Sequence, residues 1–171
     1  MGMTPAVTFF VPGVPQPGGS KKGFAVKTRS GKMRIAIVED AKHNAPWRAK
    51  VALAASQHFS APLTGPLEVR FEFTMPRPKA HFGTGRRVAI LKPGAPVGHV
   101  SAPDTTKLVR STEDALKGIA WADDAQVVLQ TASKLYGEVP GCQITIRPHM
   151  PAEVAPTAPN MLPLFEGDGH A

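Results

Sequence analysis

The sequence predicts a single α/β (α+β) domain, in which a mixed sheet of about four or five strands packs against two main helices. The chain has 171 residues, about the length of one domain and too short for two ordinary ones. Hydrophobic residues make up 42% of it, which is enough for a core and argues against disorder throughout. Segments with strand-like alternation and segments with helical spacing both occur, as a mixed fold requires.

Each expected element rests on a local pattern. The apolar run VTFFV reads as a strand, and Asn44 followed by Pro46 is a helix start with Pro in the first turn. The clearest strand is 67–75, where apolar and polar residues alternate. Asp104 is the expected N-cap of the second helix, and Gly118 lies near its end. In chain order we expect a strand at 7–11, a hairpin of 24–28 with 33–38, a helix at 44–59, a strand at 67–75, a helix at 104–118, and strands at 126–136 and 143–147.

Positive charge is concentrated in two Pro- and Gly-rich loops, 12–36 and 76–103. Residues 1–38 and 76–103 contain no Asp or Glu, whereas five of the 13 acids fall between residues 104 and 124. Basic segments around one acidic focus suggest a polyanion held over a metal site. A solvated basic surface kept for solubility explains the charge alone equally well.

Several classes of protein are excluded by composition. There is no apolar run of about 18 residues, so no conventional membrane span is expected. The N-terminus lacks the pattern of a secretory signal, and the single Cys142 allows neither an internal disulfide nor a cysteine-based zinc site. The phosphate-loop spacing is absent, so nucleotide hydrolysis is unsupported. We expect no small-molecule cofactor. We expect a soluble cytoplasmic protein, or one in the host cytoplasm if it belongs to a mobile element, with a disordered Pro-rich tail over 148–171.

The segment 103–127 carries the chemistry. Its helix places Lys107, Arg110 and Asp114 opposite the apolar side, with Asp104 at the start. We expect the following strand to pack on the helix and to bring Asp124 near Asp104. Two carboxylates beside Lys and Arg suit a hard cation that faces phosphate. On spacing alone, an ordinary N-cap and an ordinary Asp-Asp turn remain open as an alternative.

This segment resembles the signature of the RusA family of Holliday-junction resolvases. The matching residues are Pro103-Asp104-Thr105-Thr106-Lys107-Leu108-Val109-Arg110, Asp114-Ala115-Leu116 and Asp123-Asp124-Ala125-Gln126-Val127. The flanks agree at VPGVPQPGGSKK, Pro46-Trp47-Arg48 and Lys134-Leu135-Tyr136-Gly137. The resemblance covers about 7–147 and implies a RusA-like endonuclease domain over 1–147.

The resemblance implies a role for each matched position. The family's first metal-binding Asp falls on Asp104, and its Asp after the helix falls on Asp124. Arg110 occupies the position of the catalytic Lys, where it keeps the charge but cannot donate a proton. Thr106 stands where the family has its middle Asp, and a hydroxyl cannot replace that charge. Asp123 is the best substitute by adjacency, with Glu113 and Asp114 as alternatives.

The implied activity is structure-selective hydrolysis of DNA in recombination and repair. A homodimer would cut a four-way junction symmetrically with Mg²⁺, or alternatively Mn²⁺, held by Asp104, Asp124 and Asp123, and with Lys107 and Arg110 stabilising the phosphate. The residues expected to follow the DNA backbone are Lys21, Lys22, Arg77, Lys79, Arg86, Arg87 and Lys134. Two rivals remain: a non-catalytic binder of branched DNA with a degenerate metal site, and an assembly protein that binds an acidic partner.

Overall fold

A computed structural model describes residues 5–19, 21–39 and 44–150 of the chain. The strands are β1 (Val7–Pro12), β2 (Lys21–Lys27), β3 (Met33–Glu39), β4 (Leu67–Pro76), β5 (Val127–Gly137) and β6 (Gly141–Pro148). The helices are α1 (Asn44–Ser56) and α2 (Thr105–Leu116), with the short 3₁₀ helices η1 (Lys79–His81), η2 (Gly85–Arg87) and η3 (Asp124–Gln126). The predicted tail lies outside the described residues from residue 151 onward.

Four strands form one mixed sheet in the order β1-β6-β4-β5. β6 pairs antiparallel with both β1 and β4, whereas β4 and β5 are parallel. A parallel pair needs a long crossover, and here the loop 76–103 followed by α2 provides it. The predicted α+β fold, with a mixed sheet of four strands and two main helices, is confirmed.

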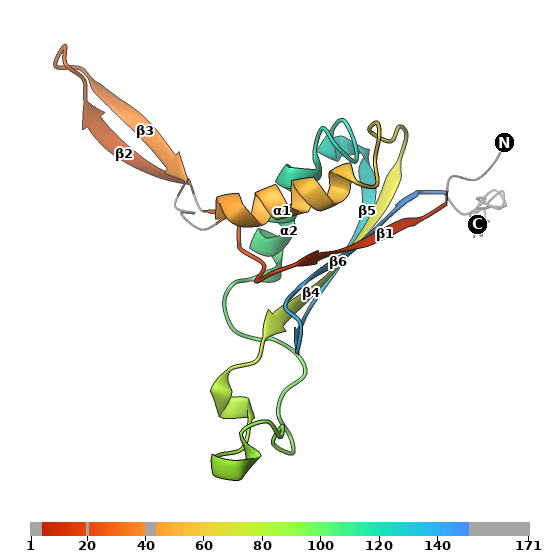
Figure 1. Ribbon diagram of the computed structural model, residues 1–171. Coiled ribbons are helices and arrows are strands. Elements are labelled where there is room, and N and C mark those ends of the chain that lie inside the picture. Colours follow the sequence, from red (N-terminus) through yellow and green to blue (C-terminus); the bar gives the residue numbers. More distant parts are fainter. Residues whose placement is uncertain (1–4, 20, 40–43, 151–171) are drawn as a thin grey trace, which may run out of the picture.

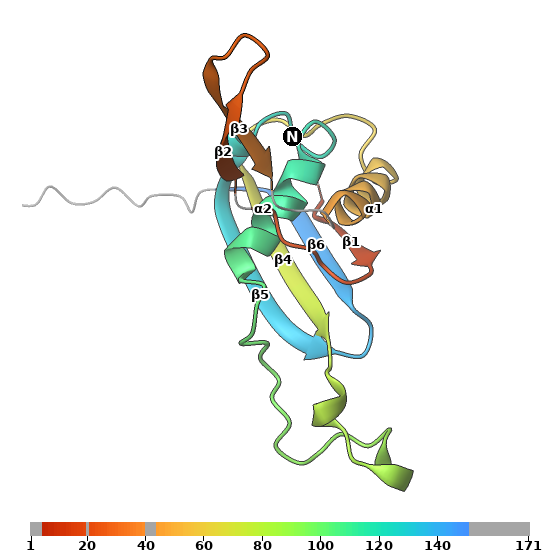
Figure 2. The same ribbon diagram turned by 90° about the vertical axis from the view of Figure 1, so that its left-hand side faces the viewer.

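Both helices lie on the same side of this sheet (Figures 1 and 2). The alternation predicted for β4 is confirmed, because Leu67, Val69, Phe71, Phe73 and Met75 are all buried beneath the helices. On the opposite face of the sheet β4 presents its polar side chains, and there Arg147 donates to both carboxylate oxygens of Glu68 at 2.8 Å. The core therefore fills only the space between the sheet and the helices.

The two helices are joined by polar contacts as well as by packing. Buried Trp47 of α1 donates from Nε1 to Oγ1 of Thr112 at 3.2 Å, and Arg48 forms an ion pair with Asp114 of α2. On another side of α2, the backbone N–H of Gly18 donates to the carbonyl of Lys107 at 2.8 Å. These contacts hold α2 in place between α1 and the segment that follows β1.

Two basic segments extend away from this core (Figure 1). β2 and β3 pair as a separate antiparallel hairpin, with Gly31 at a φ of 81° in its turn. The hairpin was predicted, but its first strand begins at Lys21, inside the stretch expected to be loop. The loop 76–103 extends from one end of the sheet and contains η1 and η2. No helix in the described ranges is long and apolar enough to cross a membrane.

Candidate active site

The start of α2 holds the first group of predicted site residues. Asp104 is the N-cap, with an extended backbone, and its Oδ1 accepts from the N–H of Lys107 at 2.8 Å. Its Oδ2 lies 3.0 Å from Nζ of the same lysine. The backbone hydrogen bond and then the ammonium group of Lys107 hold the pKa of Asp104 below its ordinary value. Asp104 is therefore a carboxylate at neutral pH.

Lys134 of β5 fixes the segment that leads to Asp104. Its Nζ donates to the carbonyls of Ser101 and Pro103 at 2.7 and 2.5 Å. An ammonium that holds two backbone carbonyls orders the chain immediately before the helix. Lys134 is also one of the residues expected to follow the DNA backbone; in this structure its ammonium group binds the two carbonyls that precede Asp104.

The outer side of the first turns of α2 is open to solvent. Thr106, Lys107 and Arg110 are all exposed, whereas Leu108 and Val109 between them are buried. The predicted division of this helix into a charged and an apolar side is confirmed. A phosphate group approaching Asp104 from solvent would meet both cationic side chains.

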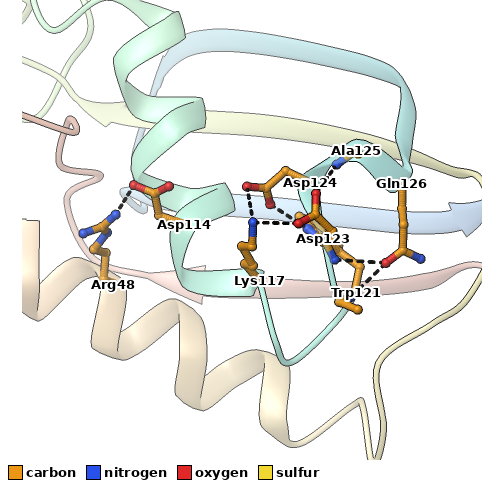
Figure 3. Close-up of polar contacts among 9 residues, drawn as sticks. Arg48, Asp114, Lys117, Trp121, Asp123, Asp124, Ala125 and Gln126 are labelled. Atoms are coloured by element: carbon orange, nitrogen blue, oxygen red, sulfur yellow. Dashed lines mark hydrogen bonds and ion pairs between the residues drawn. The ribbon is translucent and has the colours of Figure 1, made fainter.

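The turn after α2 holds the second group of acidic residues (Figure 3). Asp123 caps η3: its Oδ1 accepts from the N–H of Ala125 at 2.9 Å, and its Oδ2 accepts from Nζ of Lys117 at 3.1 Å. These two bonds, the backbone one first, lower the pKa of Asp123, while its carboxylate raises the pKa of Lys117. Asp123 is thus occupied in closing the turn.

Asp124 is held on both sides within this turn. Its Oδ1 accepts from Nε1 of buried Trp121 at 2.9 Å, and its Oδ2 lies 3.4 Å from Nζ of Lys117. Glu113, at the end of α2, accepts from the side-chain amide of Gln130 on β5. Burial raises the pKa of Glu113, and the nearby negative charge of Asp124 raises it further. Glu113 and Asp124 therefore share one electrostatic environment.

The two groups lie at opposite ends of α2. The helix has 12 residues, so about 18 Å of helical rise separates its ends. The expectation that Asp124 comes near Asp104 is therefore wrong within one chain. Among the described residues, no group of three or more His, Cys, Asp or Glu side chains is placed to hold a metal ion. The residues of a single chain do not fit the predicted Mg²⁺ site.

The candidates to replace the missing carboxylate at Thr106 are also distant from it. Asp123 and Glu113 belong to the far end of α2, and Asp114 is paired with Arg48 of α1. None of the three stands beside Asp104 in the same chain.

The other predicted DNA-binding residues fall into three groups. Lys79, Arg86 and Arg87 are exposed on the loop 76–103. Arg77 instead donates to the carbonyl of Pro96 at 2.9 Å and lies over the ring of Tyr136. Lys21 and Lys22 lie in β2, and their side chains are outside what the structure describes.

Sequence reasoning missed Lys117 and the indole N–H of Trp121, which together hold Asp123 and Asp124. A signal was present: Lys117 follows Glu113 by four residues, so the two lie on one side of the helix end. Trp121 is fully buried. Its polar atom is satisfied by Asp124, as a buried indole requires.

Comparison with known proteins identifies the family of this chain. The family model for endodeoxyribonuclease RusA matches residues 12–147, a range that includes both ends of α2 and the basic loop. The chain belongs to the RusA family. RusA proteins are nucleases that act on branched DNA junctions, so this chain is a nuclease by family. A Bacillus subtilis (strain 168) protein named "Uncharacterized protein YqaN" is 30% identical over 142 residues, which cover 82% of this chain and 95% of that relative.

Proposed function

We propose that this protein resolves Holliday junctions as a homodimer, by symmetric, metal-dependent cuts in which each active site uses residues from both copies. The observation that supports it is the separation of Asp104 and Asp124 at opposite ends of α2. Two carboxylates that far apart cannot share one ion in a single chain. A second copy running in the opposite direction would place Asp124 of one chain beside Asp104 of the other.

The outer edge of β5 is a surface suited to that second copy. β5 is an edge strand, and the chain covers this edge only near its end, where the N–H of Tyr136 donates to Val97 and that of His99 donates to Lys134. Over 127–133 no further backbone partner occurs in the described ranges, and this stretch contains no charged residue. Long uncharged edges of this kind favour pairing with another strand.

Antiparallel pairing of 127–133 with its own copy would be centred near Gln130. The start of one β5 would then lie opposite Lys134 of the other, and Lys134 already contacts Pro103 next to Asp104. A two-fold axis perpendicular to the sheet keeps both α2 helices on the same face. The pairing therefore places the start of each α2 beside the end of the other copy's α2. This gives two equivalent sites, one for each DNA strand to be cut.

The chain's own residues have distinct roles in this arrangement. Asp104 and Asp124 of opposite copies would hold the divalent cation, which when bound supplies Lewis-acid chemistry to a phosphodiester. Lys107 and Arg110 would bind the phosphate, and Arg110 would do so as a permanent cation because its guanidinium does not deprotonate. Lys134 would keep Asp104 in position through Ser101 and Pro103.

The first test is cleavage of a labelled four-way junction beside a matched linear duplex, with and without Mg²⁺. We expect paired symmetric nicks in the junction alone and only with metal. Asp124→Asn should abolish cutting and keep junction binding, because Asn retains an oxygen acceptor for Trp121. Glu138→Gln is the matched control, because Glu138 is an exposed carboxylate outside the helices with no assigned role. Metal-independent binding without cleavage would favour the non-catalytic binder, and equal handling of both DNAs would favour the assembly protein.

Mixing two inactive variants tests whether the site is shared. In a mixed dimer of Asp104→Asn and Asp124→Asn, one site carries both substitutions and the other carries neither. We therefore expect the mixture to regain nicking that each variant lacks alone. If mixed dimers form and remain inactive, each site lies within one chain and the shared arrangement is wrong.

A further inference from the structure

The loop 76–103 is a strongly basic arm that ends in exposed apolar side chains. It extends beyond the end of the sheet, away from the hairpin of β2 and β3 (Figures 1 and 2). It contains no acidic residue and carries Arg77, Lys79, Arg86, Arg87 and Lys92. At its tip, Val88 and Ile90 are 64% and 58% exposed.

The tip is held in shape by its own backbone. The N–H of Gly83 donates to the carbonyl of Ile90 at 2.9 Å, and the N–H of Lys92 donates to that of His81 at the same distance. Between them, the N–H of Arg87 donates to Thr84 at 3.1 Å and closes η2. A Cβ atom on Gly83 would lie 2.7 Å from the carbonyl oxygen of Arg87, so the two arms of the tip pack closely. Val88 and Ile90 are therefore presented by an ordered turn.

The base of the arm is joined to the strand that positions Asp104. Arg77 links the two sides of the arm through the carbonyl of Pro96, and its guanidinium lies 5.6 Å from the ring centre of Tyr136 on β5. The N–H of His99 donates to the carbonyl of Lys134 at 3.1 Å. The arm and the start of α2 thus share one support, so a ligand bound at the tip is held in a defined relation to Asp104.

We propose that Val88 and Ile90 form an apolar wedge that enters branched DNA between unstacked bases, while Arg86 and Arg87 bind the flanking phosphates. This inference rests on the proposed junction-cutting function and adds a residue-level device for recognising the branch. Proteins that bend or open DNA commonly insert aliphatic side chains between base steps and place cations on the adjacent backbone. The tip has both features, and its arm is free of the acidic residues that would repel phosphate.

Fluorescence of 2-aminopurine at the crossover of a four-way junction tests the wedge without cleavage, because this base brightens when it unstacks. The experiment uses the full chain, without divalent metal, at saturating protein. The variant Val88→Ser/Ile90→Ser removes the apolar tip at exposed positions. The control is Val139→Ser, because Val139 is also 64% exposed but lies in the turn between β5 and β6.

We expect the parent and the Val139→Ser control to raise the fluorescence several-fold. The double variant should bind the junction within a few-fold of the parental affinity, give no rise and cut more slowly. An equal rise with the double variant, or no rise with the parent, overturns the wedge even if the parent cuts junctions normally. Failure of the parent to bind or cut the junction overturns the proposed function instead. Binding to phosphatidylserine vesicles that the double variant loses, with its fluorescence response intact, would assign the tip to a membrane surface.

Discussion

Asp104 is both the N-cap of α2 and a predicted catalytic carboxylate, and two substitutions separate these roles. Asp104→Ala removes the acceptor of the 2.8 Å bond from Lys107; the loss of such a cap costs about 1 kcal/mol. The ion pair with Lys107 is about half exposed on both sides and adds less than about 1 kcal/mol. Asp104→Asn keeps the cap, because Asn and Asp are about equally good in that position.

We therefore expect Asp104→Ala to lower the free energy of unfolding by about 1–2 kcal/mol, which for a chain of this length lowers Tm by about 3–6 °C. Asp104→Asn should lower Tm by no more than about 3 °C. Both should abolish junction cutting, since each removes the charge. Circular dichroism measures the unfolding, and the labelled four-way junction measures the cutting.

Glu138→Ala is the matched control, because Glu138 is an exposed carboxylate outside the helices and should change neither property. Equal destabilisation by Asn and Ala would refute the capping role. Cutting at the parental rate by the Asn variant would remove Asp104 from the catalytic residues.

Three further predictions address other parts of the site. Thr106→Asp should raise the rate of junction cutting by about tenfold or more if the missing carboxylate limits the reaction, as partners at metal sites are commonly worth 10- to 100-fold; an unchanged rate would show that the shell is complete without it. Because burial raises the folded-state pKa of Glu113, its contribution to stability is present at acidic pH and is lost as pH rises through that pKa. Glu113→Gln should therefore be more stable than the parent in urea at neutral pH, with the difference vanishing in acid; a difference independent of pH would contradict the assignment. Lys134→Met should cost about 1–3 kcal/mol of stability through the lost carbonyl bonds and lower kcat with little change in KM, while Lys134→Arg restores kcat; an effect on KM alone would return Lys134 to the DNA-binding residues.

Patterns that depend on one element were readable from the sequence. The alternation of Leu67, Val69 and Phe71 predicted a strand buried on one face, because period two is a local property of the backbone. In the same way, Asp104 predicted the start of α2, because an N-cap is defined by its own first turn. β4 begins and ends within one residue of the prediction, and α2 starts within one residue of it but ends at Leu116, two residues before the predicted end.

Patterns that depend on two elements were not readable. Strand order, and the parallel pairing of β4 with β5, follow from how the crossover through α2 packs on the sheet. That Arg77 and Lys134 bind backbone carbonyls depends on the tertiary structure. Nothing in the sequence distinguishes a lysine that stabilises a loop from one that binds phosphate. The charge pattern of the sequence therefore predicts which segments are basic. The hydrogen bonds within the folded chain determine which of their side chains remain available to DNA.

The position of Asp124 shows the same limit most clearly. The strand after α2 runs antiparallel to the helix. The start of such a strand lies beside the end of the helix, and only the end of the strand lies beside the start of the helix. In this fold the residue that returns is Lys134, which contacts Pro103, whereas Asp124 remains with Glu113 and Lys117 at the far end. Proximity of Asp104 and Asp124 is thus excluded by the topology of one chain, although the resemblance to the family's signature implies that both bind the metal. A second copy related by a two-fold axis resolves this conflict, and regained nicking in the mixture of Asp104→Asn and Asp124→Asn is the result that requires it.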